Sequence, residues 1–172
     1  MTFLAANALT VNLVFSTLIF WLVARIYLVP RLPALDPRAV LVPILLLHST
    51  RHLGLMFLSP GATYPGLPPR FAYPAALGDF LAALLALLAL PAVLRGSPAA
   101  KPLVWLFNLE GLLDLIAAIT LATLYDAAPF MGPAYWIPAL WVPALLVTHF
   151  LTFTLLRRAW PGVLTGDRLS ES

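Results

Sequence analysis

Long apolar runs, separated by short polar and proline-rich segments, set the pattern of this chain. A membrane-spanning helix needs about 20 predominantly apolar residues. Five runs reach this length, at about residues 4–28, 39–58, 72–94, 102–124 and 134–156. The pattern predicts an all-α fold, a polytopic transmembrane helix bundle of about five spans. We expect one domain over residues 1–158 and a polar tail over residues 159–172.

The segments between the runs carry helix-breaking and helix-starting signals. The segment 29–38 holds three prolines, and its Asp36-Pro37 pair is typical of a cap followed by the first turn of a helix. The segment 59–70 is rich in proline and glycine and is expected to cover one end of the bundle. The first run has no basic residue before it and is longer than the apolar core of a cleavable signal peptide, so we interpret it as a retained span.

Composition agrees with this interpretation and excludes several classes of site. Of the 172 residues 62% are hydrophobic and 10% are charged, whereas an ordinary soluble domain is roughly 25% charged. The chain has no cysteine, which excludes disulfides, thiolate metal sites and cysteine nucleophiles. Although the net charge is +3, the basic residues lie mostly at the ends of apolar runs. We therefore expect no nucleic-acid partner.

The distribution of basic residues predicts an orientation. With five spans, one side of the membrane receives eight of the ten basic residues, namely Arg25, Arg31, Arg38, Arg95, Lys101, Arg157, Arg158 and Arg168. Because cytoplasmic loops are enriched in Lys and Arg, we expect the N-terminus outside and the C-terminus in the cytoplasm. The expected location is the bacterial inner (plasma) membrane.

Titratable side chains interrupt the apolar runs near their middles. The second run contains His48, Arg51 and His52, whose i, i+3 and i, i+4 spacing predicts one shared helix face. The other runs contribute the remaining candidates, which are Asp79, Asn108, Glu110, Asp114 and His149. A rise of about 1.5 Å per residue places most of these at similar depths. Because a charge that faces lipid costs about 2.5–3.5 kcal/mol or more, we expect a buried polar cluster.

Two roles for this cluster stay open. Arg51 is one cation against three acids, so we expect it to pair with Asp114 or Asp79. The pairs would then brace the bundle, since buried polar contacts between membrane helices contribute roughly 0.6–2 kcal/mol each. Alternatively, the remaining protonatable groups would serve a proton relay or bind a small polar or amphipathic ligand.

Cofactor sites are the alternative to these roles. His48 or His52 together with His149 would supply two haem ligands, and a histidine with an acid would supply a quinone site. A metal site on His48, His52, Glu110 and Asp114 has suitable spacing, but Arg51 is an unfavourable neighbour for a cation. We predict neither a metal nor a cofactor, and haem or quinone would be present only under this alternative. Hydrolase, phosphate-loop and dinucleotide motifs are absent from the sequence.

An ordered set of short motifs resembles a known family. The motifs are Arg51-His-Leu-Gly54, Leu67-Pro-Pro-Arg-Phe-Ala72, Gly78-Asp79, Trp105-Leu-Phe-Asn-Leu-Glu-Gly-Leu-Leu-Asp-Leu115 and the stretch from Pro138 to His149. Together, over about residues 50 to 155, they resemble a family of small uncharacterised bacterial polytopic membrane proteins with no established activity. Here Leu106-Phe107 separates Trp105 from Asn108, where the family pattern has them adjacent.

The resemblance implies membrane residence and emphasises some candidates over others. It covers Arg51, Asp79, Asn108, Asp114 and His149, and it does not cover His48, His52 or Glu110. Taken with the residue patterns, it leads us to expect a non-enzymatic integral membrane protein. Its expected partners are the lipid bilayer and either another membrane protein or a second copy of the chain.

Overall fold

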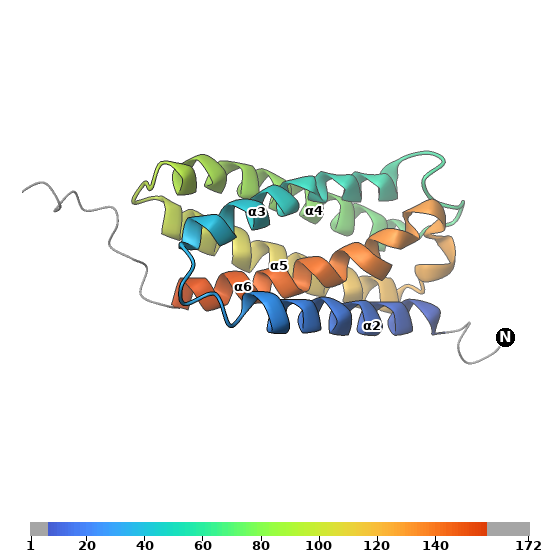
Figure 1. The fold of residues 1–172 in the computed structure, drawn as a ribbon. Helices are drawn as coiled ribbons and strands as arrows, with labels where there is room; N and C mark the ends of the chain where they lie inside the picture. The colour runs from blue at the N-terminus through green and yellow to red at the C-terminus, as the bar shows by residue number, and fades with distance from the viewer. Residues whose placement is uncertain (1–6, 158–172) are drawn as a thin grey trace, which may run out of the picture.

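Five helical spans run back and forth along a common axis in this computed structural model, which describes residues 7–157 (Figure 1). The spans are α2 (Ala8–Val23) continued by η1 (Ala24–Leu28), α3 (Pro37–Ser49) continued by η2 (Thr50–Leu58), α4 (Pro69–Leu94), α5 (Ala100–Leu124), and α6 (Val142–Arg157) preceded by η3 (Ala128–Phe130), η4 (Gly132–Tyr135) and η5 (Ile137–Trp141). All five are long and apolar enough to cross a membrane. The prediction of an all-α bundle with five such helices is confirmed. The predicted tail 159–172 lies outside the described residues.

Proline and a carboxylate cap start the second span earlier than the apolar pattern indicates. Pro37 is the first residue of α3, and the Asp36 side chain accepts a hydrogen bond of 3.0 Å from the Arg38 backbone N–H. The other described spans after the first also begin two or three residues before the apolar run, at Pro69, Ala100 and Gly132. Polar or proline residues are tolerated in a first helical turn because its N–H groups have no partner within the helix.

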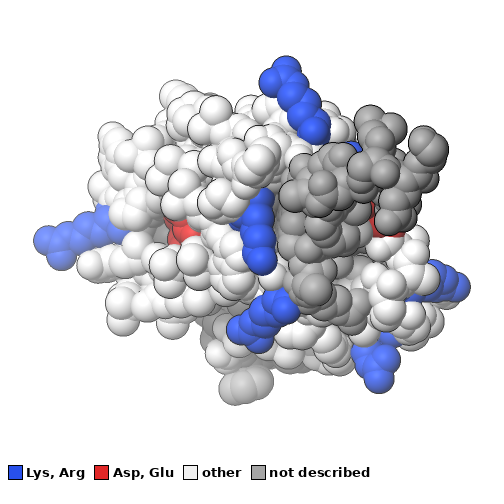
Figure 2. Space-filling view, turned by 90° about the vertical axis from the view of Figure 1, so that its left-hand side faces the viewer, with Lys and Arg blue, Asp and Glu red and all other residues white. Residues whose placement is uncertain are grey.

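The two ends of the bundle differ in chemistry. At one end, called the basic end, residues 29–36 and 95–99 connect the spans and α6 terminates (Figure 1). Figure 2 faces this end and shows Lys and Arg side chains projecting around it. At the opposite end, called the loop end, residues 59–68 pack on residues 125–136, with backbone hydrogen bonds of 2.9 Å from Tyr64 N to Phe130 O and from Ala134 N to Ala62 O. The proline-rich segment therefore covers the loop end, as its composition predicts.

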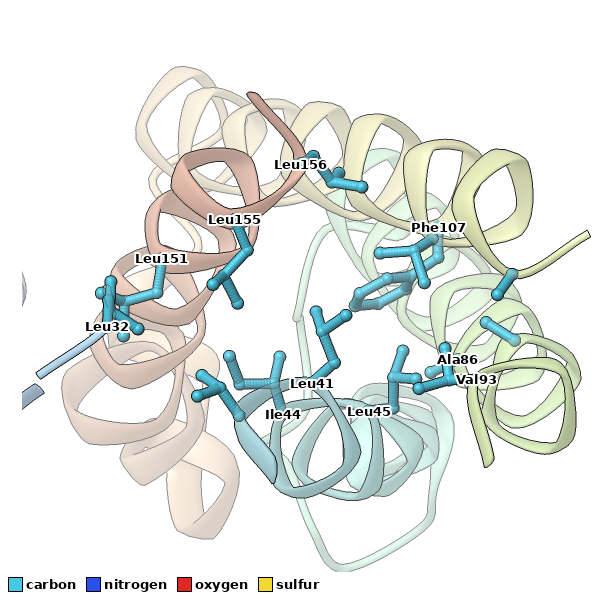
Figure 3. Close-up of a cluster of buried hydrophobic side chains, with 14 of the residues drawn as sticks. Leu32, Leu41, Ile44, Leu45, Ala86, Val93, Phe107, Leu151, Leu155 and Leu156 are labelled. Carbon is cyan, nitrogen blue, oxygen red and sulfur yellow. The ribbon is translucent and has the colours of Figure 1, made fainter. Parts of the chain in front are cut away.

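Two apolar cores fill the bundle. The core nearer the basic end includes Leu41, Leu45, Val93, Phe107 and Leu155, which point toward one another from four helices (Figure 3). The core nearer the loop end includes Phe57, Phe71, Ala75, Leu115 and Met131. Along the second span, α4 and α5 the buried polar residues lie between these two sets, whereas on α6 His149 and Thr152 follow Val147 of the basic-end core. The polar cluster thus has apolar core side chains on both sides.

The outer surface of the bundle is also apolar. Leu124, Leu113, Phe15 and Leu88 are among many large hydrophobic side chains that are more than half exposed, at 70%, 64%, 62% and 61%. Soluble monomers rarely expose apolar surface on this scale. The surface suits contact with lipid chains.

The second span changes its winding in the middle. Residues 50–58 form a 3₁₀ helix, whereas such runs seldom exceed 3–4 residues. A 3₁₀ helix has three residues per turn, so residues three apart align on one face. Arg51, Gly54 and Phe57 follow this spacing, and all three are buried. The winding therefore aims Arg51 and Gly54 at the same residue of a neighbouring helix, Asp79 of α4.

Candidate functional site

The Arg51 guanidinium is the centre of the buried cluster and bonds to three helices. Its Nε donates to Asp79 Oδ1 on α4 at 2.7 Å, and its Nη2 donates to Asp114 Oδ2 on α5 at 2.6 Å. Its Nη1 donates to the Gly111 carbonyl oxygen at 3.0 Å and lies 3.4 Å from His149 Nε2 on α6. The structure thus gives Arg51 both of the acids that the sequence offered as alternative partners. The planar guanidinium suits this role because its N–H groups point in fixed, divergent directions.

The hydrogen bonds around His149 assign its tautomer. Arg51 has only donors, so His149 Nε2 must accept, and the ring proton belongs on Nδ1. His149 Nδ1–H donates a hydrogen bond of 2.8 Å to Asn108 Oδ1. In return, Asn108 Nδ2 donates to the His149 carbonyl oxygen at 3.3 Å. His149 and Asn108 are fully buried. The amide of Asn108 therefore fixes the ring orientation that lets His149 accept from Arg51.

His48 is buried beside this network and bonds to a residue that the sequence did not single out. The Thr148 hydroxyl donates to the backbone carbonyls of Ala144 and Leu145, so it accepts from His48 Nε2 at 2.9 Å. The other ring nitrogen, Nδ1, has no hydrogen-bond partner among residues 7–157. The His48 and His149 rings are in contact, with centroids 4.3 Å apart. His48 thus packs the end of the cluster that adjoins the basic-end core.

Three polar side chains of the cluster, those of Asp79, Asp114 and His149, each lie against a glycine of the preceding span. A Cβ atom added to Gly54 would collide with the Asp79 carboxylate, and one added to Gly78 would collide with the Asp114 carboxylate. One added to Gly111 would lie 2.7 Å from Arg51 Nη1 and 2.8 Å from His149 Cε1. The missing side chains create the space that the polar groups occupy. The role of Gly78 and Gly111 is thus close approach between helices, as in other small-residue helix contacts.

The structure corrects the placement of His52 and refines that of Glu110. The prediction that His52 shares the buried face was wrong, because the 3₁₀ winding aligns residues three apart and turns His52 outward. Its side chain is exposed, and its Nδ1 lies 3.0 Å from the Ser49 carbonyl oxygen. Glu110 is half-buried, and its Oε2 has no hydrogen-bond partner within residues 7–157. The two ion pairs of Arg51 go to Asp79 and Asp114, and neither His52 nor Glu110 joins them.

A cavity of about 290 Å³ extends from the cluster toward the loop end. Its walls come from all five spans and are mostly apolar, with Leu13, Phe57, Ala75, Leu115 and Val142 among them. Among the described residues of the wall, Asp79 is the one ionisable side chain. A second hollow, of about 560 Å³, shares Leu9, Thr10, Ala122 and Thr123 with the cavity and reaches exposed residues of the loop end. The arrangement can hold an apolar body with one polar contact at its inner end.

The histidines do not fit a bis-histidine haem site. His48 and His149 are in direct ring contact, so a porphyrin between them would require their helices to separate. Three of their four ring nitrogens also have hydrogen-bond partners, in Thr148, Arg51 and Asn108. Within residues 7–157 no three His, Asp or Glu side chains are grouped so that they could hold a metal ion. These contacts make the histidines part of a hydrogen-bonded network.

Sequence reasoning missed the cavity and Thr148. The cavity depends on small residues in register, such as Ala118 and Ala122 on one side of α5, and i, i+4 alanines are too common in apolar helices to mark a site. Thr148 is adjacent to His149, but neighbouring residues on a helix face different directions, so the sequence links it to neither histidine. Only the packing of α3 against α6 brings the hydroxyl to His48.

Comparison with known proteins gives one match. The family model described as "Domain of unknown function (DUF8737)" matches residues 8–157. This range includes all five helical spans and every residue of the cluster. No curated protein and no solved structure matches the chain.

Proposed function

The chain belongs to this family of unknown function, and we propose that it is an integral membrane protein that binds a small amphipathic molecule in the cavity beside Asp79. The Arg51 cluster braces the helices that form the cavity. The observation that carries the proposal is the cavity itself, an apolar space that ends on one carboxylate of a buried ion-pair network. Ligand sites commonly combine apolar walls with a small number of placed polar groups.

The exposed surface supports residence in a membrane. Large apolar side chains cover the outside of the helices, and Lys and Arg gather at the basic end (Figure 2). We propose that the basic end faces the cytoplasm of a bacterial cell, with the protein in the inner membrane and its N-terminus outside. The mouth of the cavity then lies near the outer surface.

Bracing and binding fall on different residues of the cluster, and Asp79 takes part in both. Arg51 side-chain atoms are 0% exposed, and those of Asp79 are 9% exposed. Arg51, Asp114 and His149 do not line the cavity, whereas Asp79 does. Asp79 is therefore the residue through which the buried network would contact a ligand. The protein needs no catalytic group for this role, and we propose a binding protein in preference to an enzyme.

A pair of neighbouring alanines on α5 provides the experiment. Ala118 lines the cavity and Ala117 is exposed on the outer surface. In mild detergent, decanol should raise the unfolding temperature of the parent and of Ala117→Phe in a saturable manner, because a ligand that binds the folded state stabilises it. Ala118→Phe should lose this response, since its ring fills the cavity. Equal responses of the two variants, or no response of the parent, would contradict the proposal.

The redox alternative has its own direct measurement. None of the histidine contacts favours haem or quinone, but the absorption spectrum of the purified protein before and after dithionite tests haem independently of the structure. A Soret band that shifts on reduction and is lost in His149→Ala would replace ligand binding with electron transfer as the proposed function. Quinone extracted from the purified parent but not from Ala118→Phe would identify quinone as the cavity ligand.

A further inference from the structure

We infer that the cavity selects an amphiphile with a cationic amine head and rejects one with an anionic head. This inference deepens the proposed function and rests on it. It follows from which residue of the ion-pair network lines the cavity, from the charge balance of that network, and from the residues of the adjoining hollow.

The cavity meets the acid of the ion pair and not the base. Asp79 lies in the wall, while Arg51 lies behind it with its side chain fully buried. Asp79 Oδ1 accepts from Arg51 Nε at 2.7 Å, and the guanidinium does not line the cavity. A ligand head that reaches the inner end therefore meets a hydrogen-bond acceptor. An amine can donate to it, whereas a carboxylate head would place two acceptors together.

The charge of Asp79 is only partly balanced by Arg51. The same guanidinium also pairs with Asp114 at 2.6 Å, so one cation is shared by two carboxylates. With both acids ionised, these three side chains carry a net charge of −1. An ammonium group near Asp79 would compensate this excess, and charge-assisted hydrogen bonds are among the stronger ones in proteins. A carboxylate head would increase the excess in a space with low dielectric constant, where like charges repel more than in water.

The adjoining hollow carries charge of the same sign. Asp126 lines this second hollow, which shares four wall residues with the cavity at the loop end, and its side chain is exposed. Among residues 7–157, no Lys or Arg lines either hollow. A cationic head would thus find carboxylates, and no described Lys or Arg, both in the cavity wall and in the hollow beside it.

The volume limits the apolar part of the ligand. An engineered apolar cavity of about 150 Å³ holds benzene, and this cavity has about 290 Å³. A chain or ring system of about ten to twelve carbons is a reasonable occupant by this scaling. Decylamine, decanol and decanoate are matched probes, because they share nearly the same apolar body and differ in the head.

Thermal unfolding in mild detergent, as a function of probe concentration, separates the possibilities. We expect decylamine to reach half of its maximal shift at about a tenfold lower concentration than decanol, a difference of about 1.4 kcal/mol. Decanoate should give no saturable shift. Ala118→Phe should lose the response to both decylamine and decanol, and Ala117→Phe should retain both. In Asp79→Asn, decylamine and decanol should reach half of their maximal shifts at similar concentrations. If that variant does not fold, the comparison of the three probes on the parent tests the charge selectivity.

Two different failures have different meanings. If decanoate binds as tightly as decylamine, or decanol matches decylamine on the parent, the charge selectivity is wrong while cavity binding stands. If no probe gives a saturable shift that Ala118→Phe abolishes, the proposed function is wrong, and the inferred selectivity is wrong as well.

Discussion

Asp79 on α4 packs directly against the backbone of Gly54 on η2, where an added Cβ atom would lie 2.6 Å from the Asp79 Cβ. Three residues before Gly54, on the same face of the 3₁₀ helix, Arg51 donates to this carboxylate. The glycine and the ion pair are therefore parts of one contact. The same relationship recurs between successive spans, from Gly78 to Asp114 and from Gly111 to His149.

Gly54→Ala should destabilise the protein. The added methyl group meets the Asp79 carboxylate and Cβ, and neither can retreat without weakening the Arg51 contact. Overpacking of this kind costs typically 1–3 kcal/mol, and we expect a loss of at least about 2 kcal/mol in reversible unfolding in detergent. A double-mutant cycle with Asp79→Ala identifies the cause, because Gly54→Ala should cost less once the carboxylate is gone. Strictly additive effects would show that the clash with the Asp79 Cβ, which alanine retains, sets the cost instead of the clash with the carboxylate.

Removing Arg51 should cost more than removing either acid. Arg51→Met leaves Asp79 and Asp114 adjacent and without their cation, and breaking a buried pair in this way costs about 3–5 kcal/mol. Asp114→Asn should cost less, because the amide oxygen can still accept from Nη2. Asp126→Asn, at an exposed position, is the control and should stay within about 0.5 kcal/mol of the parent.

Ligand binding distinguishes the roles of the two acids. Asp114 does not line the cavity, so Asp114→Asn should lower the unfolding temperature and leave the shift produced by decanol unchanged. A variant as stable as the parent would contradict the bracing role of the Arg51–Asp114 pair.

The His149 ring should be neutral, with its proton on Nδ1 and none on Nε2. This tautomer follows from donation by Arg51 to Nε2 and acceptance by Asn108 Oδ1. The ¹⁵N chemical shifts of histidine-labelled protein distinguish the two ring nitrogens, and a His149→Gln sample assigns the resonances. In Asn108→Ala the fixed Nδ1–H signal should broaden or move. A His149 proton on Nε2 in the parent would contradict the network.

The sequence predicted the helices well and the site partly, for different physical reasons. Span length and apolar content are local properties, so five helices could be identified from the pattern alone. Matching depths predicted that Arg51 pairs with Asp114 or Asp79, since a buried cation needs a partner at its own level, and the structure pairs it with both. The glycine contacts and Thr148 depend on how neighbouring helices are rotated, and apolar patterns that surround the whole helix give little information about rotation. The cavity depends on the same rotations and on Phe57, Ala75 and Val142 meeting from separate spans.

The predicted α-helical winding of the second span was the main error. Substitutions at His48 and His52, compared as a pair, test the observed winding. An α-helix would place both on one buried face, whereas the structure buries His48 completely on α3 and exposes His52 on the 3₁₀ segment that follows. His48→Ala should cost about 2–4 kcal/mol, because it removes a fully buried ring that contacts Phe107 and His149. His52→Ala should change the free energy of unfolding by less than about 0.5 kcal/mol. Similar losses at both positions would mean that the span continues as an α-helix through residue 52, and Arg51 would then have to reach Asp79 from a different direction.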